Sequence, residues 1–167
     1  ESEAQIIGSE TTELAEYYLQ QHALNPIEID DTREANWEHN NYVKTIPAHE
    51  REWGYQNEGN LDFPCERVIV EIPIKPNKDI QLLSGLQSSR FTISFSEKEF
   101  SWNQDSISFV VETKGYGFSM DNDQIAGKVH DKIDEVNQFI KWKNDDINKE
   151  NVSLLNNIKA LIDSRKQ

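Results

Sequence analysis

Cysteine is nearly absent from this chain, since Cys65 is the only one among 167 residues. A single thiol cannot form an intrachain disulfide, so a core rather than covalent crosslinks must hold the fold together. No window approaches the ~18 consecutive apolar residues that a membrane-spanning helix requires. The cationic and apolar regions of a secretory signal peptide are also missing. These absences lead us to expect a cytoplasmic protein that does not bind membranes.

Basic residues are scarce as well. There are 17 Lys and Arg against 30 Asp and Glu, which gives a formal net charge of -13. A field of this sign repels phosphate backbones and anionic lipids. The densest basic stretch, KWKNDDINK, carries two aspartates within it. We therefore expect no direct binding of nucleic acid.

The apolar share is low for a globular protein, at 36% with a mean hydropathy of -0.75. The 4 Trp, 5 Tyr and 7 Phe are nevertheless enough to build a core, so the low share favours an elongated shape or long polar segments over disorder. The chain begins with ESEAQ, without methionine, and ends within a helical pattern. From this we expect a piece of a longer protein.

The first third of the chain predicts one helix followed by irregular structure. Residues 9–24 place Leu14 and Tyr18 on one helical stripe, and Asn25-Pro26 ends the pattern. Residues 30–62 are polar, with isolated aromatic residues and no clear period. Within them we expect short helical turns near residues 32–38 and 48–53, whose aromatic side chains hold them on the core.

The middle of the chain predicts a sheet. The stretch ERVIVEIPI alternates apolar and polar residues, and the same alternation returns at residues 91–95 and 107–111. The polar triplet at residues 103–105 marks a turn. These segments predict an antiparallel meander of about four strands with one apolar face.

Residues 121–167 predict a helix. Asp121 or Asn122 caps its start, and apolar residues recur at nearly seven-residue intervals from Ile125 onwards, although Lys143 and Glu150 occupy two of these positions. The polar stretch KNDDINKEN leaves two alternatives, a helix exposed to solvent there or a hairpin, and we favour one long helix. The expected organisation is an α+β core over residues 1–120 and a helical arm over residues 121–167.

One motif suggests a catalytic metal site. In FVVETKGYG, Glu112 and Lys114 point to the same side of a strand, as the glutamate and lysine of metal-dependent nucleases do. Glu97 and Glu99 on the neighbouring strand are the closest further carboxylates. However, Glu112 and Lys114 lie on the face opposite the buried Phe109, where an exposed ion pair is expected.

Two further sets of residues carry side chains that can bind metal or act as a nucleophile. His39, His49 and Glu50 carry zinc-binding side chains, but their spacing matches no standard motif, and polar loop residues in water are the simpler interpretation. Cys65 is a potential nucleophile with His49, although a thiol that begins an apolar strand is more often buried and inert. We expect no metal and no cofactor.

The apolar stripe of the arm carries our main functional hypothesis. Residues 125–142 are expected to pack on the sheet, which is too small to cover the rest, and an uncovered stripe needs a partner. We therefore expect a non-catalytic protein-interaction or oligomerisation module that joins two copies of the chain or contacts another protein domain. The alternative is a metal-dependent phosphodiesterase. The expected interface residues are Ile147, Leu154, Leu155, Ile158, Leu161 and Ile162.

The second half of the chain resembles a group of uncharacterised bacterial proteins. The resemblance rests on the apolar strand and proline turn of residues 72–79, on Trp142 and Asp146, on residues 151–154, and on the terminal Arg165-Lys166. It implies a soluble part of a larger bacterial protein and brings no activity with it.

Overall fold

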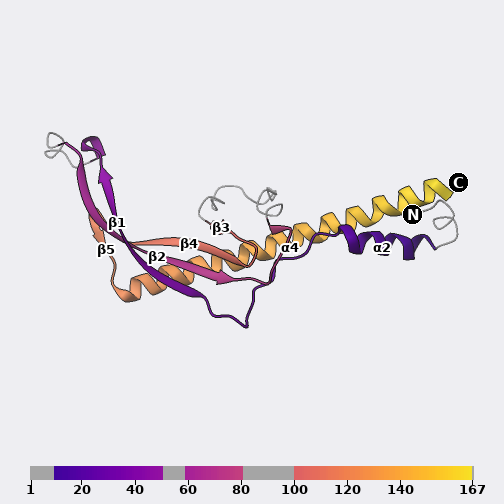
Figure 1. Ribbon diagram of the computed structural model, residues 1–167, viewed down its shortest axis with the longest axis horizontal. Coiled ribbons are helices and arrows are strands. Elements are labelled where there is room, and N and C mark those ends of the chain that lie inside the picture. The colour runs from indigo at the N-terminus through magenta and orange to yellow at the C-terminus, as the bar shows by residue number, and fades with distance from the viewer. Residues whose placement is uncertain (1–9, 51–58, 81–99, 167) are drawn as a thin grey trace.

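The computed structural model describes residues 10–50, 59–80 and 100–166 of the chain. Its architecture is α+β, as the sequence predicts, with an N-terminal helix, a small antiparallel sheet and a long C-terminal helix (Figure 1). The predicted apolar segment at residues 91–95 lies outside the described residues. In chain order the elements are α2 (Thr11–His22), β1 (Asn36–Ile46), η1 (Ala48–Glu50), β2 (Leu61–Pro73), β3 (Phe100–Trp102), β4 (Ser106–Gly115), β5 (Phe118–Ser119) and α4 (Asn122–Lys166).

The strands are ordered β1-β2-β4-β3, and the short β5 pairs with the end of β4. The prediction of a simple meander is therefore wrong, because β4 lies between β2 and β3. The apolar faces explain this order. β2 and β4 pair over most of β4 and bring their apolar side chains opposite one another, whereas β3 pairs with β4 over three residues. The predicted turn at residues 103–105 joins β3 to β4.

One face of the sheet is buried, as the alternation predicts. α4 runs along this face (Figure 1) and covers it with Val129, Val136 and Ile140. Trp102 of β3 packs against Phe139 of α4 with ring centroids 4.8 Å apart. The residues that β2 and β4 contribute to the hydrophobic core are Val68, Val70, Ile72, Ile107, Phe109 and Val111.

β1 corrects the sequence prediction for residues 30–62. The helical turn expected at residues 32–38 is wrong, because Asn36–Ile46 is a strand paired with β2 over its whole length. Of its side chains only Ile46 is buried, so neither face carries an apolar pattern. Trp37 is 44% exposed and does not hold the segment on the core. The turn expected near residues 48–53 is present as η1 in its described part.

α4 is one continuous helix of 45 residues, as favoured from the sequence, and extends about 67 Å at 1.5 Å per residue. Its start is capped as predicted. Asp121 accepts a hydrogen bond from the Gln124 backbone N–H at 2.8 Å, and the Gln124 side chain accepts one from the Asp121 N–H at 3.0 Å. This reciprocal pair satisfies two backbone donors at the helix start.

The polar middle of α4 is continuous and is not fully exposed to solvent, because the extended segment after α2 lies against it. Asn144 accepts a hydrogen bond from the Ile27 N–H and donates one to the Ile27 carbonyl, both at 2.8 Å. Asn151, seven residues further on, bonds the N–H and carbonyl of Leu24 in the same way, both at 2.9 Å. Since positions seven apart share a helix face, the two asparagines bind one strip of backbone and keep the polar stretch helical.

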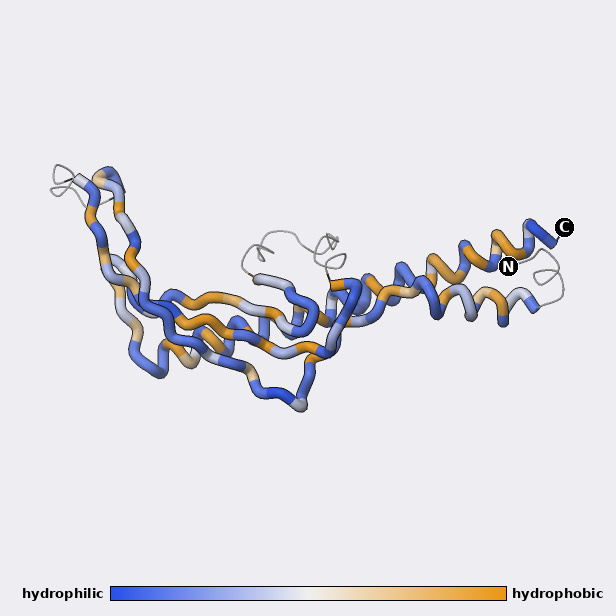
Figure 2. Tube along the Cα trace, in the orientation of Figure 1, coloured by the Kyte–Doolittle hydropathy of each residue, from blue (hydrophilic) through white to orange (hydrophobic). Residues whose placement is uncertain are grey.

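Beyond the sheet, α4 continues beside α2, and the two helices form an arm (Figure 1). They are antiparallel, because Thr11 at the start of α2 donates a hydrogen bond to Asp163 near the end of α4, at 2.9 Å, whereas Leu24, just after α2, bonds Asn151 twelve residues earlier on α4. Ala15 of α2 and Ile162 of α4 are buried between them. Figure 2 shows hydrophobic residues recurring along both helices of this arm. From here on the arm is α2 together with residues 148–166 of α4, a different segment from the helical arm of residues 121–167 expected from the sequence.

Candidate protein-interaction surface

The arm carries an apolar groove between its two helices, with a volume of about 250 Å³. The residues that line it are mostly apolar, and Arg165 and His22 are the polar ones among them. Two antiparallel helices bury only the stripe where they touch, so their flanks remain open to solvent unless another element covers them. The apolar residues that line the groove are Leu14, Tyr18, Leu154, Ile158, Leu161 and Ile162.

The six residues predicted as an interface differ in how far they are exposed to solvent. Ile147 is buried in the core between the sheet and α4, and Ile162 is buried against α2, so a single copy already covers both. Leu154, Leu155 and Ile158 are partly buried. Leu161 is 63% exposed. The end of the arm therefore offers the apolar surface that the prediction requires, and Ile147 does not belong to it.

Several exposed or groove-lining residues of the arm were not predicted as interface residues. Val152 of α4 is 58% exposed, and Tyr17 of α2 is 47% exposed. Tyr18 of α2 lines the groove. The apolar period of residues 9–24 shows α2 to be amphipathic, but it carries no information that α2 packs on the far end of a helix more than a hundred residues later.

The charges of the arm are divided between its helices. α2 contains Glu13 and Glu16 and no Lys or Arg, so its formal charge is -2. Residues 154–166 of α4 contain three basic residues and one acidic residue, a formal charge of +2. Within the described residues, neither glutamate forms an ion pair, and the same holds for Lys159 and Arg165. Glu13, Glu16, Lys159 and Arg165 thus have no charged partner among the described residues of one copy.

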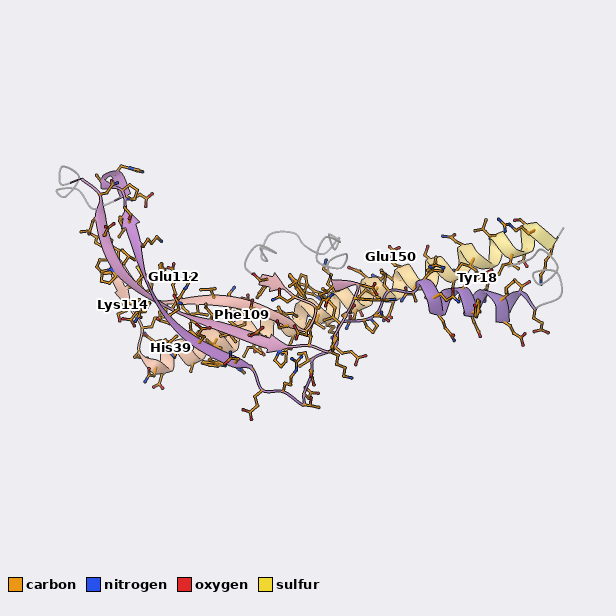
Figure 3. The ribbon with its side chains drawn as sticks, in the orientation of Figure 1. Tyr18, His39, Phe109, Glu112, Lys114 and Glu150 are labelled. Carbon is orange, nitrogen blue, oxygen red and sulfur yellow. The ribbon has the colours of Figure 1, made fainter. Side chains whose placement is uncertain are left out.

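Glu112 and Lys114 lie on the sheet, away from the arm and its Tyr18 (Figure 3). Each has a partner on another strand of the sheet, Lys114 on the neighbouring β2 and Glu112 on β1, which lies beyond β2. The Glu112 carboxylate accepts a hydrogen bond from the Tyr42 hydroxyl at 2.6 Å, and the Lys114 ammonium lies 3.1 Å from the Glu66 carboxylate. These are the exposed cross-strand pairs that the strand alternation favours over a catalytic site.

Among the described residues that line the hollow beside Glu112, there is no second carboxylate. It borders an open hollow of about 560 Å³ between β4 and the start of α4, where the other charged residues are Lys128 and Lys132. A magnesium ion is normally held by one or two carboxylates together with substrate phosphates. Glu97 and Glu99, the predicted further ligands, lie outside the described residues. Among residues 10–50, 59–80 and 100–166, no three His, Cys, Asp or Glu side chains gather into a metal site.

The other predicted site residues are not brought together. His39 lies on β1, seven residues from the strand's end, or about 23 Å, while His49 and Glu50 lie in η1 beyond that end. Cys65 is buried opposite Tyr42, and its thiol donates to the Phe63 carbonyl at 3.6 Å. His49 is thus not a base beside this thiol.

The contact between Tyr42 and Glu112 has a measurable consequence. The hydrogen bond to the carboxylate raises the pKa of Tyr42 to about 12, with desolvation adding to the effect. The phenol of the unfolded chain ionises near 10, so the stability that this contact contributes is complete below pH 10 and is lost as the pH rises to about 12. We expect Glu112→Gln to move the pKa of Tyr42 back towards 10.

The measurement is an absorbance titration at 295 nm, in which Tyr42→Phe supplies the difference curve for Tyr42. An identical Tyr42 titration in the wild type and in Glu112→Gln would show that the hydrogen bond does not form.

Comparisons of the chain with protein-family models, curated proteins and solved structures found no match. The resemblance to uncharacterised bacterial proteins therefore stays a prediction, and the surfaces must be interpreted from their own geometry. Within the described residues, α4 included, no helix combines the length and apolarity needed to cross a membrane.

Proposed function

We propose that this protein is a non-catalytic interaction module whose arm is the contact surface. The observation that carries the proposal is the exposed apolar side chain of Leu161 beside the apolar groove between α2 and α4. Single exposed apolar residues are ordinary on protein surfaces. An apolar groove with exposed apolar residues beside it and charged residues nearby is typical of a surface that another protein covers.

The rest of the molecule supports this role. The sheet and the first half of α4 form the core, and the hydrogen bonds of Asn144 and Asn151 fix the approach to α2. The arm is therefore held in one direction relative to the sheet, so binding does not require it to be ordered first.

In-cell photo-crosslinking tests the proposal. A photoreactive amino acid replaces Leu161 in the full chain, and a matched variant carries it at Val110, an exposed apolar residue (46%) on the sheet. We expect protein adducts at position 161 at several times the yield of position 110, because a covering partner brings its side chains within reach. Equal yields at both positions, or none at position 161, would contradict the proposal.

A further inference from the structure

We infer that the partner of the arm is a second copy of this chain, packed so that each α2 lies against the second copy's α4. This inference rests on the proposed function and names its partner. The two arms then form a four-helix bundle in which neighbouring helices are antiparallel, with a two-fold axis parallel to the arm. The apolar groove of each copy is closed by the other.

The charges of the arm select a second copy. A surface with separate negative and positive helices is complementary to itself when a two-fold axis exchanges them. In such a dimer the helix α2 of each copy, with a formal charge of -2, lies against residues 154–166 of the second copy's α4, with a formal charge of +2. Glu13, Glu16, Lys159 and Arg165 form no ion pairs within the described part of one copy, so they remain available for this contact.

The same charges select the axis. A two-fold axis perpendicular to the arm places like helices together, α2 on α2 or α4 on α4. Such contacts place two negatively charged α2 helices, or two positively charged ends of α4, against each other, and like charges at an interface are unfavourable. Only the axis parallel to the arm pairs unlike helices in both halves of the contact.

The size of the arm predicts a weak dimer. α2 has 12 residues and is about 18 Å long, and two helices side by side are about 20 Å wide. The contact area is then on the order of 400 Å² per copy, below the ~600 Å² per partner at which stable specific interfaces begin. We expect a dissociation constant of about 1–100 µM, so dimerisation responds to the concentration of the protein.

Charge exchange tests the arrangement. One variant carries Glu13→Lys and Glu16→Lys, and the other carries Lys159→Glu and Arg165→Glu. Each variant places like charges across its own dimer contact, so self-association should weaken at least about tenfold. A 1:1 mixture restores unlike charges in both halves and should associate within about threefold of the wild type. Sedimentation equilibrium of the full chain from 1 to 300 µM at low salt measures this, and circular dichroism checks that both variants fold.

Salt gives a second test that needs no variant. Raising NaCl from 50 to 500 mM shortens the screening length and should weaken the wild-type dimer at least about threefold. Variants that associate as tightly as the wild type, or affinity that is unchanged by salt, would overturn the arrangement. A wild-type monomer at 300 µM would overturn the dimer. If the photoreactive residue at position 161 then crosslinks to a different protein, the proposed function stands and the dimer is contradicted. If no adduct forms at all, both the proposed function and the dimer are contradicted.

Discussion

Replacing Asn144 by alanine is expected to lower the free energy of unfolding by about 2–4 kcal/mol. The side chain accepts from the Ile27 N–H and donates to the Ile27 carbonyl, both at 2.8 Å, and Ile27 is 2% exposed. Alanine leaves both backbone groups without their partner. An unpaired buried polar group costs about 1–3 kcal/mol, which far exceeds the small gain in helix propensity.

The matched control is Asn137→Ala, seven residues earlier on α4. Asn137 is exposed, so its replacement is expected to change the stability by less than about 0.5 kcal/mol. Urea denaturation of the two variants measures the difference. Equal stabilities would mean that the paired hydrogen bonds do not hold the segment after α2 on α4, and the fixed direction of the arm would lose its support.

Asn77 holds the same segment from the other side. It is 4% exposed, and its side-chain amide donates to the carbonyls of Asn25 and Pro26, each at 3.1 Å. The Asp79 carboxylate in turn accepts from the backbone and side chain of Asn25. The turn between α2 and the sheet is therefore fixed by polar side chains in addition to the burial of Ile27 in the core.

The sheet and α4 could be predicted because burial leaves a period in the sequence. The strand at Val68 and Val70 and the strand at Phe109 each bury alternate residues, and the apolar steps of α4 follow its contact with them. Even Lys143, which interrupts the stripe, is buried at 2% exposure, its ammonium 5.3 Å from the Phe139 ring centroid. The apolar period of α4 therefore continues although a lysine occupies one of its buried positions.

β1 could not be predicted, because backbone pairing with β2 rather than burial makes it a strand. Along Asn36–Ile46 only the last side chain is buried, so no alternation exists to be detected. The contacts between the segment after α2 and α4 could not be predicted either, because they join residues that are far apart in the sequence. Leu24 and Asn151 are 127 residues apart, and nothing local marks either as a partner of the other. The seven-residue spacing of Asn144 and Asn151 was the available signal.

The candidate surface was predicted in part. The apolar stripe included Leu161 and Ile158, which line the open groove, because the stripe continues beyond the part of α4 that the small sheet covers. Their place in an interface stays a prediction. The stripe also included Ile147, which the core buries, since periodicity cannot locate the end of the sheet along the helix. The contribution of α2, including Tyr18, depends on the fold and lay beyond the pattern.

Leu161→Glu is expected to weaken self-association at least about tenfold while leaving the fold intact. In one copy the side chain is 63% exposed, so a carboxylate there stays hydrated and the melting temperature should change by less than about 2 °C. In the dimer the same carboxylate must lose water inside an apolar contact. Val110→Glu is the matched control, because it places the same charge at an exposed apolar position on the sheet.

The measurement that tests the dimer most directly is sedimentation velocity of the wild type and these two variants from 1 to 300 µM. We predict that the sedimentation coefficient of the wild type and of Val110→Glu rises with concentration towards that of a dimer, while Leu161→Glu needs at least about tenfold higher concentration for the same rise. If all three proteins sediment alike at every concentration, the exposed face of the arm is not where two copies meet, and the dimer is contradicted.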